Sequence, residues 1–252
     1  MKVRPPMLFV SATLAATCLG SACNRQPGES DARAEPEAST SPAIAEAASH
    51  VALLRVVNGV PGEPATDVMV GDQVAFDKVA FGTVTPYREF TTEAVTFRLR
   101  SSVPDNASPL AETTERLNAG KHYTLLAMPY DPGHVGMTLL VDEVAPPTEG
   151  KAALRVMNAS PEPGNVDVDL KGSGRALVSG PAGSSASGFV DVAPVQGTLV
   201  VHRARAVLAR VPDARLEPGR RYTVLLLGAD QPPAGGHEAR LIDEPYPGSP
   251  QS

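Results

Sequence analysis

The sequence predicts an all-β protein that contains two β-sandwich domains in tandem. The first observation is a duplication, because residues 54–58 (Leu-Arg-Val-Val-Asn) recur one hundred positions later as residues 154–158 (Leu-Arg-Val-Met-Asn). The second is composition: 22 glycines and 25 prolines in 252 residues, with 4% aromatic residues, favour short strands and turns over long helices. The third is the alternation of apolar and polar residues in several segments, which is typical of half-buried strands.

The first 50 residues are predicted to serve export. A basic start and an apolar run over residues 7–19 predict a signal peptide over residues 1–22, and the run is shorter than the roughly 20 residues of a membrane span. Small residues before Cys23 resemble the lipobox of bacterial lipoproteins, which implies lipid on Cys23. Asn24 is not the Asp that resembles an inner-membrane retention signal, so an outer-membrane location is favoured. The alternative is ordinary cleavage beside an incidental cysteine. Residues 23–50 contain few large apolar residues, which predicts that a disordered linker follows the lipid anchor.

The segments of the first copy are predicted as follows. Residues 51–58 are almost continuously apolar, as a strand covered on both faces is. Residues 95–100 alternate, which indicates a half-buried strand. Residues 79–87 are predicted to be an edge segment, because a proline near their end cannot donate to a central ladder. Residues 110–117 suit either a strand or a short helix, and a strand is favoured.

The same turn occurs in both copies. Gly120 is followed by Tyr123, and 99 residues on, Gly219 is followed by Tyr222, each at the predicted start of a strand. This pattern resembles the tyrosine corner of immunoglobulin-like and fibronectin type III sandwiches, in which the ring packs in the core and its hydroxyl bonds the backbone. The glycine supplies the backbone freedom of the turn. These four residues are predicted to be architectural.

The repeat sets the domain boundaries. The copies close on residues 137–143 and 239–244, which align Asp142 with Asp243. A proline-rich joint between the copies is predicted to limit relative motion. The predicted organisation is a first sandwich, a linker, a second sandwich and a tail, over residues 51–147, 148–150, 151–246 and 247–252.

The order of these features resembles a known bacterial family. Leu-Arg-Val-x-Asn, a Pro/Gly turn, Asp-Val, Phe-Gly and Gly-x-x-Tyr-Thr before a final apolar strand are similar to the domain of unknown function 4397 family, over nearly all of residues 51–246. The resemblance implies exported, often lipid-anchored and commonly tandem domains with an immunoglobulin-like or transthyretin-like sandwich fold. It supplies no catalytic residues. In the second copy a small-residue loop, residues 180–188, replaces residues 81–87, so a binding surface at that edge is expected in the first copy only.

Several classes of function are disfavoured. A net charge of −6 gives no basic footprint for nucleic acid. The only cysteines, Cys18 and Cys23, precede the folded part, so a disulfide framework and a cysteine nucleophile are excluded there. No histidines have metal-site spacing, and alternation places Asp167 and Asp169 on a wet strand face. Ser184 lies in a glycine-rich loop without a nucleophile elbow, so no catalytic residue, metal or cofactor is predicted.

Two further groups of residues bear on binding. The second copy holds a basic series that predicts solvated strand faces, with contact to an anionic surface as the alternative: His202, Arg203, Arg205, Arg210, Arg215, Arg220 and Arg221. Phe81, Tyr87 and Phe90 form a possible binding edge for sugar, although core packing is favoured for them. The leading hypothesis is a non-catalytic, lipid-anchored cell-envelope module that mediates protein interaction or scaffolding. The alternative is binding of carbohydrate or another cell-surface polymer.

Overall fold

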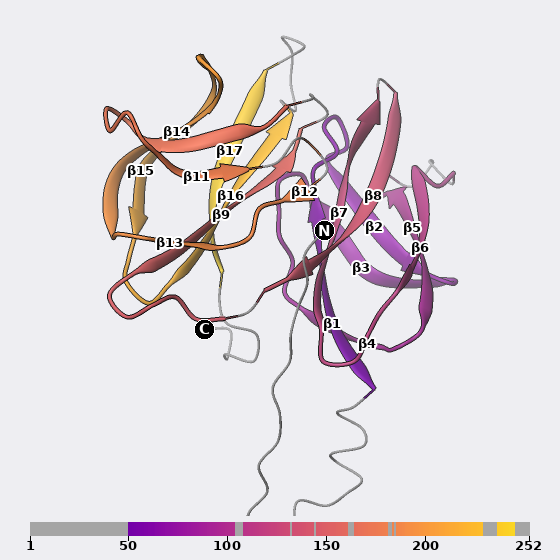
Figure 1. Cartoon of the computed structure of the whole chain (residues 1–252). Helices are drawn as coiled ribbons and strands as arrows, with labels where there is room; N and C mark the ends of the chain where they lie inside the picture. Colours follow the sequence, from indigo (N-terminus) through magenta and orange to yellow (C-terminus); the bar gives the residue numbers. More distant parts are fainter. Residues whose placement is uncertain are drawn as a thin grey trace, which may run out of the picture. The chain divides into compact units, whose positions relative to one another are not determined.

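The fold is seen in a computed structural model, in which every regular element of the described residues is a strand (Figure 1). The all-β prediction is therefore confirmed. The signal peptide, Cys23, most of the tether, Ser184 and the tail lie outside the described residues. The structure describes residues 50–103, 108–131, 133–143, 145–160, 164–180, 183, 185–228 and 236–244, all of which belong to one compact unit.

The first sandwich consists of two four-stranded sheets, in the orders β4-β1-β7-β8 and β3-β2-β5-β6. Neighbouring strands are antiparallel except for β1 and β7, which are parallel. The strands are β1 (Val51–Asn58), β2 (Ala65–Val70), β3 (Gln73–Ala80), β4 (Arg88–Thr91), β5 (Ala94–Ser101), β6 (Ala111–Arg116), β7 (His122–Asp131) and β8 (His134–Asp142).

The second sandwich has the same plan. Its sheets have the orders β11-β10-β14-β15 and β12-β9-β16-β17, β13 also pairs with β9, and β9 is parallel to β16. The strands are β9 (Ala152–Ala159), β10 (Val166–Leu170), β11 (Ala176–Gly180), β12 (Ser185–Ala186), β13 (Val190–Val192), β14 (Val195–Arg203), β15 (Ala206–Leu216), β16 (Arg221–Gly228) and β17 (His237–Glu244).

The core of each sandwich follows from alternation along its strands. In β5, Phe97 and Leu99 are buried while Thr96 and Arg98 are only partly covered, so the half-buried strand is confirmed. Residues 111–116 form strand β6, and the alternative of a helix there is wrong. The predicted edge over residues 79–87 is divided, because β3 ends at Ala80 and the chain rejoins the opposite sheet in β4.

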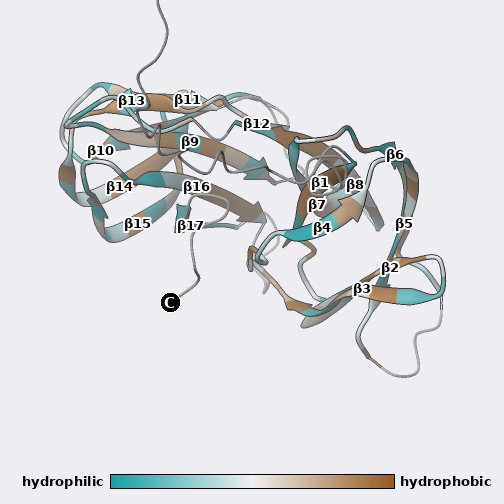
Figure 2. Ribbon diagram, turned by 90° about the horizontal axis from the view of Figure 1, so that it is seen from below, coloured by the Kyte–Doolittle hydropathy of each residue, from teal (hydrophilic) through white to brown (hydrophobic). Residues whose placement is uncertain are grey.

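The central strands β1 and β9 are buried on both faces, as the apolar run of residues 51–58 predicted. One face of each strand lies on its own core. The other face contributes to a third apolar cluster, which we call the seam. The cluster contains Phe81, Met128, Ala159 and Leu227, and at its centre are Val57 and Leu126 of the first copy with Met157 and Leu225 of the second. The four central side chains are at most 1% exposed. Figure 2 shows the seam strands β1, β7, β9 and β16 as predominantly hydrophobic.

The turns before β7 and β16 are alike. The Tyr123 hydroxyl accepts a hydrogen bond from the amide of Asn118, and the Tyr222 hydroxyl accepts one from the amide of Glu217, each at 3.1 Å. Gly120 and Gly219 have φ angles of +68° and +77°, a region in which an L side chain is strained. Ring burial, the backbone hydrogen bond and a left-handed glycine thus occur together in both copies.

The strand register corrects the alignment of the two copies at their ends. β7 pairs His122 with Asp142, and β16 pairs Arg221 with Glu244. Asp142 therefore corresponds to Glu244, and the alignment of Asp142 with Asp243 was wrong by one position. A shift of one residue reverses the face on which a side chain lies, so Asp142 and Glu244 are buried while Asp243 is exposed.

The strand register also relates the edges of the copies. Val84 bridges to Val57, and Ala186 pairs with Met157 at the matching place in the second copy. The chain then continues into β4 in the first copy and β13 in the second, both paired to the central strand. The small-residue loop over residues 180–188 therefore does not abolish this edge. Residues 186–189, at and just after its end, are the counterpart of residues 84–87.

Candidate functional site

A buried ionic quartet lies where the two sandwiches meet. It consists of Arg55 on β1, Asp142 at the end of β8, Arg155 on β9 and Glu244 at the end of β17. Arg155 contacts Asp142 at 2.7 Å and Glu244 at 2.9 Å, while Arg55 contacts Glu244 at 2.9 Å and Asp142 at 3.5 Å. No side chain of the quartet is more than 4% exposed. Each arginine therefore contacts one carboxylate from each copy.

The sheets themselves position these groups. Arg55 and Arg155 occupy the outward face of their central strands, which the seam covers, so each guanidinium must find its partners inside the protein. Arg55 Nε donates to Thr124 at 2.9 Å, and Arg155 Nε donates to Thr223 at 2.8 Å. The Thr124 hydroxyl donates in turn to Asp142, and that of Thr223 to Glu244. The four charges are balanced and their hydrogen bonds run in chains from one copy to the other.

Electrostatics keep both carboxyl groups ionised. Burial opposes ionisation, but the attraction of Arg55 and Arg155 outweighs it and lowers the pKa of Asp142. The same balance lowers the pKa of Glu244. For Arg55, burial is outweighed by Glu244 and Asp142, and its pKa is raised. A buried quartet of this kind has a large desolvation cost that attraction offsets, so its clearest contribution is to specify one arrangement of groups.

An aromatic ring lies over each arginine of the quartet. The Tyr87 ring lies 4.8 Å from the guanidinium carbon of Arg55, and the Phe189 ring lies 4.6 Å from that of Arg155. The Tyr87 hydroxyl donates to Asp142 at 2.7 Å, and burial raises the pKa of Tyr87. Phe189 has no hydroxyl, and a second guanidinium, that of Arg221, lies 4.3 Å from its ring.

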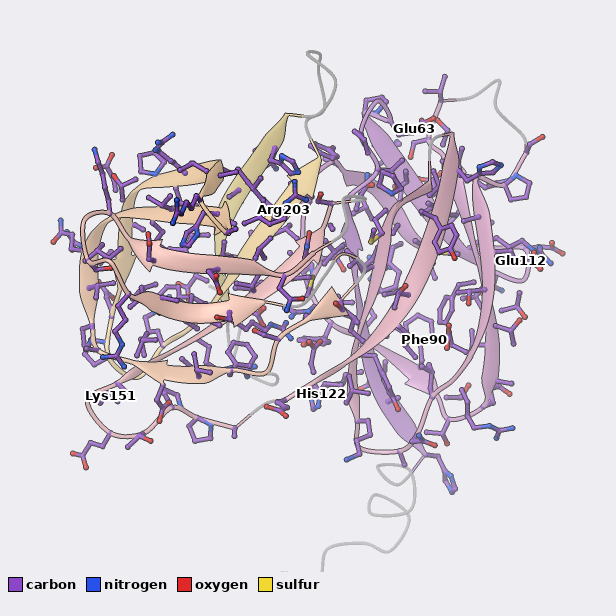
Figure 3. The ribbon with its side chains drawn as sticks, turned by 45° about the horizontal axis from the view of Figure 1, so that its top comes forward. Glu63, Phe90, Glu112, His122, Lys151 and Arg203 are labelled. Atoms are coloured by element: carbon purple, nitrogen blue, oxygen red, sulfur yellow. The ribbon has the colours of Figure 1, made fainter. Side chains whose placement is uncertain are left out.

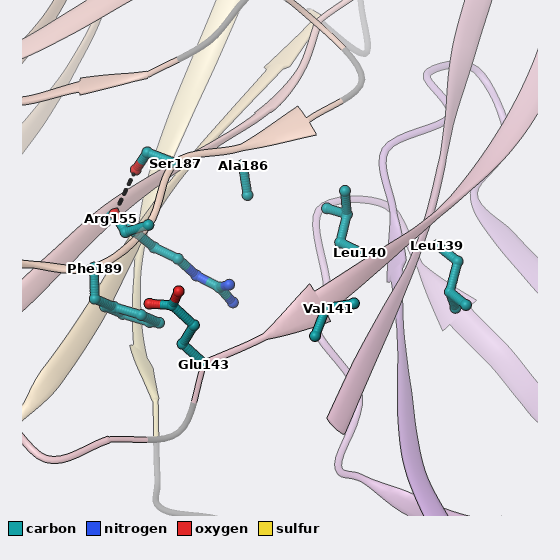
Figure 4. A pocket seen from close by; sticks show the side chains of 9 residues that line it. Leu139, Leu140, Val141, Glu143, Arg155, Ala186, Ser187 and Phe189 are labelled. Carbon is teal, nitrogen blue, oxygen red and sulfur yellow. Dashed lines mark hydrogen bonds between the residues drawn. The ribbon is translucent and has the colours of Figure 1, made fainter. Parts of the chain in front are cut away.

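A pocket of about 300 Å³ opens beside the quartet (Figure 4). Leu139, Leu140 and Val141 of β8 form one side of it. On the other side are residues 186–189 with Arg155, and the carboxyl group of Glu143 lies beside the Phe189 ring. The pocket is thus formed by both copies, with an apolar side on β8 and two charged groups, those of Glu143 and Arg155, in its lining.

The charged groups of the quartet and the hydroxyl of Ser187 are engaged in ion pairs and hydrogen bonds. The carboxylates of the quartet are held by arginines and threonines, and Ser187 donates to the carbonyl of Gly188 at 2.9 Å. Among the described residues, no group of three or more His, Asp or Glu side chains is placed to hold a metal ion. In the same part of the chain, no helix has the length and apolar character needed to cross a membrane.

The structure places the three aromatic residues of the predicted binding edge in three environments. Phe81 belongs to the seam and lies beneath Arg240, whose guanidinium carbon is 5.7 Å from its ring. Tyr87 contacts the quartet, with its ring over Arg55 and its hydroxyl bonded to Asp142. Phe90 packs within the first sandwich, where its ring lies 6.0 Å from those of Phe76 and Phe97 (Figure 3). The three rings do not share one platform.

The basic series of the second copy is likewise dispersed. His202 lies 3.2 Å from Asp169, and Arg220 pairs with Asp243 on the surface. Arg221 is 1% exposed and donates to the carbonyl of Glu143, so the prediction of a solvated face was wrong for this residue. Its counterpart in the first copy is His122, which contacts Tyr87 edge-on at 5.5 Å.

Sequence reasoning missed the quartet, although its signal was present. Arg55 and Arg155 interrupt strands that are otherwise apolar and were predicted to be covered on both faces. A buried arginine needs hydrogen-bond acceptors, and a carboxylate also balances its charge. Asp142 and Glu244, each at the end of an apolar strand near the end of its copy, were the available partners.

Comparisons with known proteins find one family model that matches part of the sequence. The family model described as Domain of unknown function (DUF4397) matches residues 52–169, which span the first sandwich and the start of the second. No curated protein matches the sequence. A solved structure, the C-terminal domain of AlgF from P. aeruginosa, has 17% identity and a TM-score of 0.32, covering 38% of this chain and 100% of its own. That likeness is too weak to carry an argument about function.

Proposed function

The family model described as Domain of unknown function (DUF4397) matches residues 52–169, and from that premise we propose that the protein is a non-catalytic cell-envelope module that binds another envelope protein. The observation that carries this proposal is the seam with its quartet. Two sandwiches that share an apolar cluster and four buried charges present their surfaces in one constant arrangement. Such an arrangement suits a scaffold, whose binding surface must keep its shape.

The apolar seam supports the same proposal. Each large side chain buried there contributes roughly 1.5–3 kcal/mol relative to an exposed one. Val57 and Leu126 of the first copy pack with Met157 and Leu225 of the second, so separation of the copies would expose both apolar faces. We infer that the two copies act as one body, and that the Pro-rich linker contributes less than the seam to holding them together.

The proposal includes export and lipid attachment through Cys23. The sequence of residues 1–50 supports this part, as a signal peptide, a lipobox-like site and a linker of low apolar content. The intact mass of the mature protein from membranes tests it. We expect a mature chain that begins with acylated Cys23, and a Cys23→Ser variant that leaves the membrane fraction. An unmodified N-terminus elsewhere contradicts the anchor without contradicting the interaction.

Carbohydrate or polymer binding through Phe81, Tyr87 and Phe90 stays a prediction. The separate environments of the three rings make protein interaction the better supported proposal, because a sugar platform needs exposed aromatic faces side by side. Titration of the full chain with envelope glycans, compared between the wild type and Tyr87→Ala, separates the two functions.

The interaction is tested by chemical crosslinking in intact envelopes. The full chain is isolated under denaturing conditions and its crosslinked partners are identified by mass spectrometry. We expect one or a few proteins to recur across replicates and to be absent when an unrelated lipoprotein is isolated in the same way. Replicates without a recurring partner would contradict the proposal.

A further inference from the structure

The pocket beside the quartet has a counterpart on the other side of the seam. The residues at the two places explain why the pocket is open and its counterpart is filled. Residues 186–188 are Ala, Ser and Gly, whereas residues 84–86 are Val, Thr and Pro. The backbone is the same in both places: the Thr85 hydroxyl accepts from the amide of Val56, and the Ser187 hydroxyl accepts from the amide of Val156. Each residue at the pocket is therefore a shortened version of its counterpart.

The larger side chains show what chemistry fits. Val84 packs against the seam cluster, and Ala186 packs against the same cluster with a single methyl group. The carbon atoms that distinguish Val84 from Ala186, and Pro86 from Gly188, are all aliphatic. The volume that the second copy leaves empty is thus one that the first copy fills with aliphatic groups.

The rim of the pocket differs in the same direction. Val141 lines the pocket and is 61% exposed, which is high for an aliphatic residue. Its counterpart is Asp243, which the strand pairings place at the matching position. The rim therefore has an apolar residue where the other copy has a charged one. Two charged residues line the pocket: Arg155, which is buried and paired with the carboxylates of the quartet, and Glu143, whose carboxylate is exposed.

We propose that this pocket anchors the partner protein by taking an aliphatic side chain of an extended segment, with a lysine or arginine of the same segment beside Glu143. The inference rests on the proposed function and names its contact surface. Strand β8 is at the edge of its sheet, and edge strands accept an added strand, which favours an extended segment. Leu139, Leu140 and Val141 are complementary to an aliphatic side chain, and the exposed carboxylate of Glu143 is complementary to a basic one, since the other charged lining residue, Arg155, is already paired with the carboxylates of the quartet.

The experiment compares the full wild-type chain with a variant whose pocket is filled by the residues of the first copy, Ala186→Val together with Gly188→Pro. A random heptapeptide library displayed on phage is selected on the wild type. We expect enriched peptides that combine a Val, Ile, Leu or Pro with a neighbouring Lys or Arg. Binding of the synthesised peptides should weaken by about tenfold or more in the filled variant, because an aliphatic side chain loses its buried site. Glu143→Gln should weaken binding of the basic peptides and leave binding of versions with the basic residue replaced by Gln unchanged.

Two results would overturn the proposal: no enrichment, or enriched peptides that bind the filled variant as tightly as the wild type. Ala186→Val alone serves as the milder variant if the double substitution does not fold. Crosslinking of the same variants in envelopes distinguishes failure of the pocket assignment from failure of the proposed interaction function. If the filled variant still captures the wild-type partner, the pocket assignment fails and the interaction function stands; if the wild type captures no recurring partner, the function fails as well.

Discussion

The two sides of the seam were built from a duplicated sequence, yet one is filled and the other is open. The quartet and its threonine partners keep their chemical type in both copies: Arg55 and Arg155, Thr124 and Thr223, Asp142 and Glu244. Residues at the rim of the pocket do not. The buried charges depend on one another for partners, since changing one leaves the others unpaired. The side chains at the rim have no such dependence.

The largest effect should come from breaking the quartet at its closest pair. Arg155 contacts both carboxylates below 3 Å, whereas Arg55 is 3.5 Å from Asp142. We expect Arg155→Met to lower the free energy of unfolding by about 3–5 kcal/mol, because buried Asp142 loses its nearest cation and buried Glu244 loses one of the two cations that lie 2.9 Å from it. Arg55→Met should lower the free energy of unfolding by a smaller amount. Urea denaturation of the full chain measures both, and equal losses would contradict the ranking.

The quartet should also make stability depend on acid pH. The folded-state pKa values of Asp142 and Glu244 lie below their ordinary values of 3.8 and 4.5, so the folded state holds fewer protons than the unfolded state. Their contribution is fully present above those ordinary values and is lost as pH falls through the lower folded values. We expect stability to be flat from neutral pH to about pH 5 with respect to these groups, and to fall below that.

Variants test which groups cause that dependence. Asp142→Asn and Glu244→Gln should each be less stable at neutral pH and show a shallower loss towards acid. Asp243→Asn is the matched control, because Asp243 is exposed and lies outside the quartet. If Asp243→Asn flattens the profile as much as Asp142→Asn does, the quartet is not its source.

The smallest effect should come from making the first copy resemble the second. Tyr87→Phe removes the 2.7 Å hydrogen bond to Asp142 and leaves a ring like that of Phe189. Asp142 retains Thr124 and Arg155, so we expect a loss of about 1–2 kcal/mol. Tyr130→Phe, at a residue that is 74% exposed, should change stability little. Thermal or urea unfolding compares the two, and a loss at Tyr130 equal to that at Tyr87 would contradict the assigned role of the hydroxyl.

Much of the fold followed from local patterns. The apolar run of residues 51–58, the alternation of residues 95–100 and the paired Gly-x-x-Tyr turns all lie on strands or turns as expected. Strand β3 was missed. Its register shifts against β2, and Lys78 has a φ angle of +47°, so the residues do not alternate as a regular strand does.

The candidate site was harder to predict, because it depends on pairings between distant residues. Arg55 and Glu244 are separated by 189 positions, and no local pattern links them. The alignment of Asp142 with Asp243 was chosen by residue identity, and the hydrogen-bonded register assigned Glu244 instead. A one-residue shift is invisible to a comparison of apolar content, yet it decides which carboxylate is buried.

The chain's amino acids alone specified two all-β copies, their tyrosine turns and strands buried on both faces, because periodicity and turn chemistry act over a few residues. They did not specify what covers those strands. Packing of one copy against the other chose the partners of Arg55 and Arg155, since a buried charge is satisfied by whichever opposite charge the fold brings within reach. The same packing left a pocket where Ala186 and Gly188 are too small to fill the seam.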